Sequence, residues 1–224
     1  MNATTARQGR PQLVDRDQIV SAAMELGLDT LSMHQLARHL GVAPATLYRY
    51  VASKEALIEA CVDAFCERIR LPDPQLSWQS YLEQLGIAFL QAIEASPGAH
   101  SYGTRMGPNT PAAYQILDQA FTVLLKAGLS HELTFNAYSL VVDHAFTTAA
   151  KRAHFAAARE NPTQAQHSML AMNEADLSAF PALSATLDAV YPPDFEAIYQ
   201  RRLLTIIAGV ERQLRALTDT RERK

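Results

Sequence analysis

A group of basic side chains without acidic neighbours is the first feature of this sequence that could do chemistry. No Asp or Glu lies between Asp29 and Glu55, so Arg38, Arg49 and Lys54 are not opposed by any carboxylate close in sequence. Cations in such a setting attract phosphate groups. The stretch is therefore a candidate surface for binding nucleic acid.

The other chemistry-bearing residues form no comparable pattern. Of seven His, His34 and His39 lie in the basic stretch and the rest are scattered without the close-spaced ligands of a metal site. We find no nucleophile elbow and no glycine-rich phosphate loop. Cys61 and Cys66 lack the C-x-x-C spacing of metal or redox pairs, so we interpret them as core residues, with a redox sensor as the alternative. No metal, cofactor or catalytic residue is predicted.

The basic stretch is carried by two short predicted helices that span Leu31 to Lys54. Ser32 and Gln35 have the spacing of a capping box, and Gly41 ends the first helix. The apolar residues between them recur at helical spacing: Met33, Leu36, Ala37 and Leu40. The small side chain of Ala37 allows a second helix to cross closely.

A second helix is predicted from Pro44, because proline lacks only an N–H group that a first helical turn does not use. Ala43, at the N-cap position, offers no capping oxygen. Leu47 and Val51 lie four residues apart on one inward face. The residues left facing outward are Thr46, Tyr48, Arg49 and Tyr50. Two helices joined in this way form a helix-turn-helix, which presents its second helix to DNA.

The segment TLYRYVASKEAL, which follows a G-V-x-x-x turn, resembles the DNA-binding head of the tetracycline-repressor (TetR) family of regulators. The resemblance implies that Thr46, Tyr48 and Lys54 contact phosphates. By position, it places base-reading side chains at His34, Pro44 and Ala45. The candidate DNA-binding residues are therefore His34, Pro44, Ala45, Thr46, Tyr48, Arg49, Tyr50 and Lys54. The alternative for the two tyrosines is that they are half-buried surface aromatics.

The charge is distributed unevenly along the 224 residues. Residues 1–54 carry six Lys or Arg against four Asp or Glu, whereas residues 55–224 carry fourteen against nineteen. An acidic remainder discourages DNA from wrapping around the protein, so a single DNA-contact surface is expected. No apolar run approaches eighteen residues and the N-terminus is polar, so we expect a cytoplasmic protein. Arg7 and Arg10 lie in a polar arm that either enters a minor groove or is solvated.

Helical patterns continue along the whole chain, and no strand pattern or repeat interrupts them. The predicted helices span about residues 15–26, 32–40, 44–51, 53–70, 78–95, 114–127, 130–161, 177–190 and 195–217. The sequence LPDPQ at 71–75 is a proline-rich joint. We therefore predict an all-α protein of nine or ten helices. A three-helix helix-turn-helix head with its linking helix would occupy residues 1–70, and a ligand-binding and dimerisation body residues 71–224.

The body also resembles the TetR family, and most of all its tetracycline-binding members, over essentially the whole chain. The matching motifs are S-W-Q at 77–79, Phe89, G-T-R at 103–105, Tyr114 and G-x-S at 128–130. Those members hold a drug chelated to magnesium with a His and an acid, and the corresponding residues here are Ser101 and Arg152. A hydroxyl and a cation do not supply that metal site, so we do not expect the magnesium-bound drug.

The resemblance and the apolar patterning together predict where a different effector binds. The candidate effector-binding residues are Arg70, Leu85, Phe89, Ser101, Thr104, Arg105, Tyr138 and Arg152. Apolar walls with few polar anchors favour a small apolar or aromatic effector, and Arg105 or Arg152 could pair an anionic group on it.

These expectations combine into one function. The chain is predicted to be a ligand-responsive transcriptional repressor that binds double-stranded palindromic operator DNA as a homodimer. The dimer interface is expected at residues 130–161 and 194–217, because an exposed apolar stripe of that length is rarely tolerated by a monomer. The open alternatives are activation in place of repression, a regulator without a ligand, and an enzyme.

Overall fold

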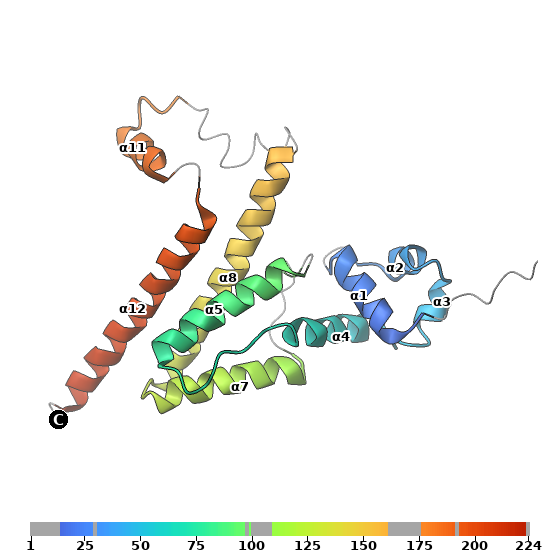
Figure 1. The fold of residues 1–224 in the computed structure, drawn as a ribbon, viewed down its shortest axis with the longest axis horizontal. Helices are drawn as coiled ribbons and strands as arrows, with labels where there is room; N and C mark the ends of the chain where they lie inside the picture. The colour runs from blue at the N-terminus through green and yellow to red at the C-terminus, as the bar shows by residue number, and fades with distance from the viewer. Residues whose placement is uncertain are drawn as a thin grey trace, which may run out of the picture.

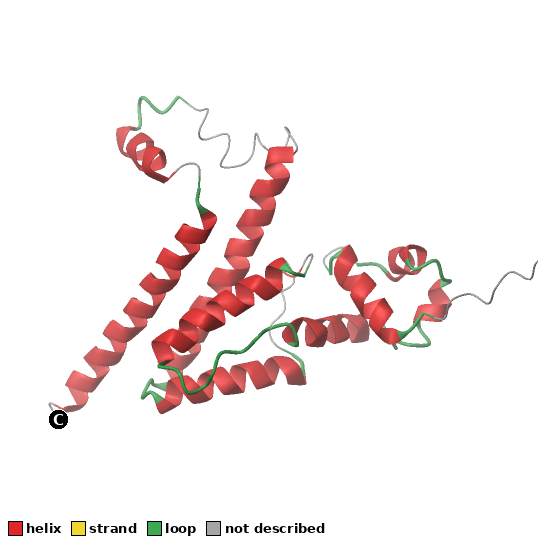
Figure 2. Ribbon diagram, in the orientation of Figure 1, coloured by secondary structure: helices red, strands yellow, loops and turns green. Residues whose placement is uncertain are grey.

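The regular structure of this protein is helical wherever the chain is described (Figures 1 and 2). The computed structural model describes residues 14–28, 31–96, 99, 109–160, 176–190 and 193–222. These residues form nine helices and no strand, which confirms the predicted all-α class. The helices are α1 (Arg16–Leu26), α2 (Met33–His39), α3 (Pro44–Leu47), α4 (Lys54–Cys66), α5 (Trp78–Glu94), α7 (Pro111–Lys126), α8 (His131–Glu160), α11 (Pro181–Val190) and α12 (Phe195–Glu222).

Helices α1 to α3 and the first half of α4 form one unit, which we call the head. Asp15 begins α1 with a complete capping box: its side chain accepts from Gln18 N at 2.8 Å, and the Gln18 side chain accepts from Asp15 N at 3.2 Å. One hydrophobic cluster holds the head together, and its fully buried members include Ile19, Leu36 and Leu47. The head is therefore a small independent core at one end of the molecule (Figure 1).

Helix α4 is shared between the head and the remainder of the chain, which we call the body. Leu57 and Cys61 pack in the head cluster, whereas Val62, Cys66 and Ile69 pack in the body cluster. The helix ends at Cys66, four residues earlier than the sequence predicts. After it, Ile69 N donates to Cys66 O at 3.0 Å, a tightened turn, and the proline at 72 disfavours helical geometry at residue 71.

The body is built around the contact between α5 and α8, the most extensive helix pair in the described chain. Helix α12 packs along α8 and α5, and α7 packs against α8 and α4 (Figure 1). Fully buried side chains from three of these helices meet in the centre: Tyr81, Leu82, Leu85, Val141, Tyr199 and Leu203. Gly86 permits this close approach, because a Cβ there would lie 2.9 Å from the Tyr199 hydroxyl.

The apolar stripe predicted on the last helix is divided between two roles. Tyr199 and Leu203 are fully buried within the chain's own body, whereas Leu204 and Leu217 are 51% and 45% exposed. The stripe therefore does not form a continuous exposed surface, because part of it completes the monomer's core. On α8, likewise, Phe146 is buried while Phe135 is 58% exposed.

Replacement of the central glycine tests this packing. Gly86→Ala is expected to lower the free energy of unfolding by about 1–3 kcal/mol, the usual cost of overpacking a core. Its Cβ would also lie 3.0 Å from Val141 Cγ1. Urea unfolding at a fixed protein concentration measures the change.

The matched control is Tyr199→Phe, which removes the nearest atom. The Tyr199 hydroxyl has no hydrogen-bond partner among the described residues, so this change alone should be nearly neutral. Combined with Gly86→Ala, it should recover part of the lost stability. An unfolding midpoint for Gly86→Ala equal to that of the wild type would contradict the close approach of α5 and α12.

Candidate DNA-binding surface and effector site

The turn between α2 and α3 fixes how the second helix is presented. Gly41 adopts φ of +67°, and Val42 N donates back to Ala37 O at 2.9 Å, which closes the end of α2. At its other end, Ser32 Oγ accepts from Gln35 N at 3.2 Å. Ala37 is buried, as expected for a side chain between two crossing helices. The predicted helix-turn-helix is thus present in the head.

Helix α3 is short, and its inward face is the predicted one. It spans four residues, and Ala43 makes no side-chain cap, as its type implied. The chain continues in helical turns, with Val51 N donating to Leu47 O at 3.0 Å. Leu47 and Val51 are both buried in the head core. Tyr48 and Arg49, which follow Leu47, lie exposed at the surface.

The predicted DNA-contact residues mostly lie on this surface. His34, Ala45, Tyr48 and Arg49 are exposed. Pro44, Thr46 and Lys54 are half-buried. Tyr50 differs from the prediction, because its ring is half-buried and packs against the head core, so it does not face fully outward. Packing prevails there because Tyr50 follows the inward residue Leu47 by three positions, close to one helical turn.

The surface retains the electropositive character that the sequence indicated. Within the described chain, Arg38, Arg49 and Lys54 form no ion pair with a carboxylate. Lys54 is the first residue of α4, whose N-cap Ser53 accepts from Ala56 N at 3.1 Å. The positive end of the α4 dipole therefore adds to the charge of Lys54, a combination that favours phosphate.

Three of the candidate effector residues come together inside the body. Leu85 is fully buried and Phe89 nearly so, both on α5. Tyr138 of α8 lies edge-on to Phe89, with ring centroids 6.3 Å apart. It also lies edge-on to Phe121 of α7, at 5.5 Å. Burial raises the pKa of the Tyr138 hydroxyl, so it is protonated at neutral pH.

Further aromatic rings extend this group in both directions. We call the whole set the aromatic row: Phe135, Phe121, Tyr138, Phe89, Phe146 and Phe65, each ring next to the one before it at centroid distances between 5.5 and 6.5 Å. The contacts of Tyr138 with Phe89 and Phe121, and that of Phe121 with Phe135, are edge-to-face, and contacts of that kind add to the stability from burial alone. The row runs from the exposed start of α8 to helix α4.

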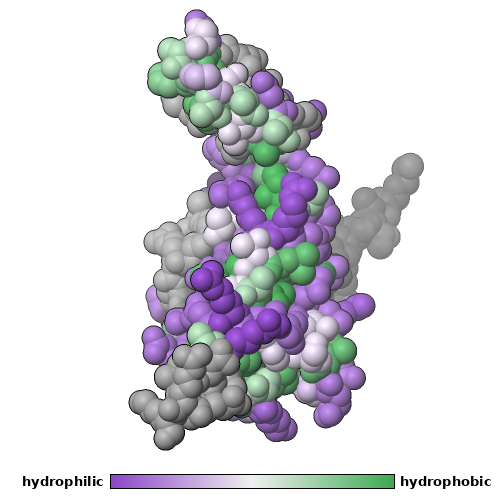
Figure 3. All heavy atoms as spheres, turned by 90° about the vertical axis from the view of Figure 1, so that its left-hand side faces the viewer, coloured by the Kyte–Doolittle hydropathy of each residue, from purple (hydrophilic) through white to green (hydrophobic). Residues whose placement is uncertain are grey.

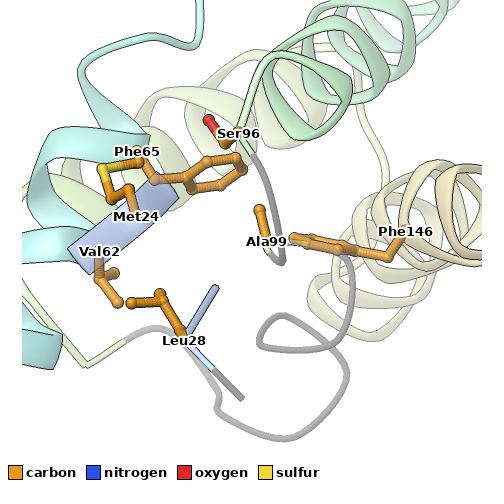
Figure 4. A pocket seen from close by; sticks show the side chains of 7 residues that line it. All are labelled: Met24, Leu28, Val62, Phe65, Ser96, Ala99 and Phe146. Carbon is orange, nitrogen blue, oxygen red and sulfur yellow. The ribbon is translucent and has the colours of Figure 1, made fainter. Parts of the chain in front are cut away.

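An apolar cavity of about 20 Å³ lies at the α4 end of the aromatic row (Figure 4). The residues that line it come from the head, α4 and the body: Met24, Leu28, Val62, Phe65, Ser96, Ala99 and Phe146. Its volume suffices for about one water molecule, but its lining offers almost no polar surface. It is therefore a packing gap at the junction of head and body and is too small for an effector.

Neutral hydrogen-bonding groups accompany the aromatic row. Gln119 Nε2 lies 3.3 Å from both the Tyr81 hydroxyl and Pro72 O, to which it donates. Burial is the main cause that raises the pKa of the Cys66 thiol, to about 11, with smaller contributions from Asp63 and Glu67. Tyr81, Cys66 and Tyr138 are therefore uncharged at neutral pH, and they provide hydrogen-bond donors rather than charges.

The remaining candidate effector residues are placed differently. Arg152 donates to Glu94 at 2.7 Å and to Glu196 at 2.9 Å, joining α8 to α5 and α12. Burial lowers its pKa, but the hydrogen bonds that it donates to these two carboxylates outweigh that effect and raise it. Its charge is thus already balanced and is not available to an anionic ligand. Arg70 is exposed beyond the end of α4. Ser101, Thr104 and Arg105 lie outside the described residues.

Sequence reasoning missed how Phe65, Phe121 and Phe146 combine with the predicted residues. Residues 130–161 are expected at the dimer interface, yet Phe146 within them packs inside the body. A local pattern cannot reveal which of two apolar faces turns inward. The sequence shows that α5, α7 and α8 each carry aromatic residues, but spacing along one helix does not show which rings of different helices meet.

We searched the described residues for clusters of metal ligands and for helices that could span a membrane. These residues contain no group of three His, Cys, Asp or Glu side chains placed to hold a metal ion. None of the helices within the same ranges is both long and apolar enough to cross a bilayer.

Comparison with known proteins identifies the fold and the family. The profile of bacterial regulatory proteins, tetR family, matches residues 19–61, and that of the tetracyclin repressor-like C-terminal domain matches residues 71–214. Tetracycline repressor protein class D from Escherichia coli is 28% identical over 216 residues, or 91% of this chain and 92% of the repressor.

Solved structures agree with the sequence matches. Apo ActR from Streptomyces coelicolor superposes with a TM-score of 0.74 at 20% identity, covering 93% of this chain and all of ActR. ActR in complex with actinorhodin gives 0.72 at 21% identity, covering 90% of this chain and 98% of ActR. With both profiles matched in order along most of its length, the chain belongs to the tetR family of bacterial regulatory proteins.

Proposed function

We propose that the protein is a transcriptional repressor that binds a palindromic operator as a homodimer and is released by an uncharged aromatic effector. The observation that carries the proposal is the exposed surface of α2 and α3. There His34, Ala45 and Tyr48 stand outward beside cations that have no carboxylate partner in the described chain. Phosphate contacts position such a head, and base contacts give it specificity.

The effector class follows from the aromatic row. Tyr138 meets Phe89 edge-on, and the raised pKa values of Cys66 and Tyr138 leave both groups as neutral donors at neutral pH. An uncharged planar ligand with hydrogen-bond acceptors fits these groups better than an anion, since Arg152 is already paired. ActR, a relative by fold, has been solved in complex with actinorhodin, which supports a ligand site in a body of this kind.

We propose repression rather than activation of transcription, because the related proteins include repressors. Tetracycline repressors align along nearly the whole chain. We assign the protein no catalytic activity and no cofactor, because its related proteins are transcriptional regulators. As a regulator of transcription it would act in the cytoplasm, where bacterial DNA lies.

The chain divides functionally after residue 70 in this proposal. Residues 1–70 bind DNA, and residues 71–224 bind the effector and the partner subunit. Helix α4 belongs to both parts by its packing, which supports a role in relaying the effector's signal to the head.

The dimer interface is proposed on α8 and α12. Figure 3 views the α12 side of the molecule, where hydrophobic residues lie in a strip between hydrophilic ones. Leu204 and Leu217 on α12 and Leu140 on α8 are about half exposed in the single chain. Apolar patches of this kind mark association surfaces.

A selection and a screen together test the proposed function. Purified protein should enrich a palindromic sequence from random duplex DNA, and a library of aromatic compounds should contain one that displaces that DNA. To move the repressor from mostly bound to mostly free, the compound must prefer the released state by several kcal/mol. If no sequence were enriched, the proposal of a sequence-specific regulator would be wrong. If a sequence were enriched but no compound released the protein from it, only the proposed effector response would be wrong.

Lys54→Ala and His34→Ala separate the two kinds of DNA contact. Lys54→Ala should weaken binding to selected and random DNA alike and reduce the salt slope by about one unit for each phosphate that the lysine neutralises. His34→Ala should cost about 1–3 kcal/mol on the selected DNA and little on random DNA. Affinities measured by fluorescence anisotropy at several salt concentrations give both numbers.

Tyr48→Phe is a second phosphate-contact variant: it removes only a hydroxyl from the exposed ring and should weaken binding to both DNAs alike. If Lys54→Ala changed sequence preference with the salt slope unaltered, the docking of the head would be wrong. If His34→Ala weakened binding to selected and random DNA equally, the proposed base-reading role of His34 would be wrong.

The dimer is tested by mass. The mass of one chain is 24.7 kDa, and light scattering at micromolar concentration should give twice that mass. Leu204→Glu should favour the monomer, since it buries a charge in the proposed interface. Phe180→Glu, on an exposed residue outside α8 and α12, is the control and should leave the mass unchanged. A monomeric wild type would contradict the proposal.

A further inference from the structure

The start of helix α3 carries few groups that could recognise a base pair. Helix α3 lies with α2 at the end of the head far from the body (Figure 1). Ala43, Pro44 and Ala45 form its N-cap and first residues, and none of them has a polar side-chain atom. The Thr46 hydroxyl belongs to a half-buried side chain. Since base pairs are distinguished mainly by hydrogen bonds to their edges, specificity needs a polar side chain from elsewhere on this surface.

Arg49 lies at the centre of the outward face of this segment. It stands midway in sequence between Leu47 and Val51, which are both buried. At about 100° per residue, Arg49 lies about 180° around the helix from their shared inward direction. Helical turns continue through it, because Arg49 N donates to Thr46 O at 3.3 Å and Val51 N donates to Leu47 O at 3.0 Å. The side chain of Arg49 is accordingly exposed.

Ala45 and Arg49 form one ridge along this outward face. They lie about one helical turn apart, and both are exposed. When a recognition helix enters the major groove, the face opposite its buried face lies nearest the base edges. Tyr48, by contrast, lies only about 80° from the inward direction, at the side of the helix where a phosphate chain passes. Arg49 is thus better placed than Tyr48 to contact a base.

The Arg49 side chain is also chemically suited to one base. It forms no ion pair and no hydrogen bond with any described residue, so its guanidinium is free to bind DNA. A guanidinium holds its N–H donors in a rigid planar fork. In the major groove, guanine presents two acceptors, O6 and N7, whereas each of the other bases presents one acceptor or none. Guanine is therefore the base that Arg49 can bind through two hydrogen bonds.

We propose that Arg49 reads a guanine in each half-site of the operator, through hydrogen bonds to O6 and N7. The inference deepens the proposed function and rests on it. Arg49 is then a specificity-determining residue, unlike Lys54, whose charge at the start of α4 suits a phosphate. Because the dimer has two-fold symmetry, the two guanines lie on opposite strands, at positions related by the symmetry of the operator.

Selection from random duplex DNA by the wild type and by Arg49→Ala tests this role. The wild type should select guanine at one pair of symmetry-related positions. In Arg49→Ala the preference for that guanine should fall by about 5- to 150-fold, the usual discrimination of a bidentate contact. The preferences at other positions of the operator should persist, because other side chains supply them.

Arg38→Ala is the matched control, because it removes another exposed arginine that has no ion pair in the described part of the head. It should keep the preference for guanine. Its affinity for random DNA should lie within about 3-fold of that of Arg49→Ala, since each variant lacks one positive charge. Circular dichroism establishes that both variants are folded.

A change in the DNA alone removes one of the two acceptors. In deazaguanine a carbon replaces N7, while pairing with cytosine is retained. By fluorescence anisotropy, the wild type should bind a duplex with this base in both half-sites about 5-fold or more weakly than the selected duplex. Arg49→Ala should bind the two duplexes with affinities within about 2-fold of each other, because the lost side chain and the lost acceptor belong to one contact.

The outcomes separate the inference from the proposed function. The inference would be wrong if folded Arg49→Ala kept the guanine preference, or if it weakened binding to selected and random DNA equally. It would also be wrong if Arg38→Ala abolished the preference, if the wild type bound the deazaguanine duplex as tightly as the selected one, or if the selected operator held no symmetric guanine. If the wild type selected no sequence at all, the proposed function itself would fail.

Discussion

The packing of helix α4 in two hydrophobic cores is the constraint on which the rest of this structure depends. Leu57 and Cys61 bury one end of the helix in the head, and Val62 and Cys66 bury the next turn in the body. A helix is stiff over such a length, so it cannot adjust in one core without disturbing the other. The head is small, and its position relative to the body is set by this one element and the contacts around it.

The division of labour between the two parts follows from that arrangement. The head uses its apolar residues for its own core, which leaves polar and basic residues of α2 and α3 free at the surface. The body buries Phe89 and Phe146 of its aromatic row and packs the half-buried ring of Tyr138 against the same core. Arg152 joins α5, α8 and α12 by two carboxylate bonds, and this keeps the row's supporting helices together. Binding of DNA to the head or of a ligand to the body thus acts on helices that are held by close packing and by these ion pairs.

Residues close together in the sequence were enough to predict the structure of the head, but not the packing of the body. Ser32, Gly41 and Pro44 set the ends of α2 and α3 through caps and turns, which depend on residues within a few positions. The roles of Arg152 and Tyr199 depend on helices far apart in the sequence. The sequence therefore predicted the helices and the exposure of Ala45, Tyr48 and Arg49. It also placed Tyr50 outward and the whole apolar stripe of α12 at the dimer interface, and there the structure differs.

The separation between the two heads of a dimer tests the account most directly. A spin label on Ser21→Cys would report it, because Ser21 is exposed on α1. The native thiols should not react, since burial raises the pKa of Cys61 to about 12 and is the main cause that raises the pKa of Cys66 to about 11. The account predicts one narrow distance distribution on the selected duplex and a different one in the free protein. Identical distributions with and without DNA, or no coupling between labels, would contradict it.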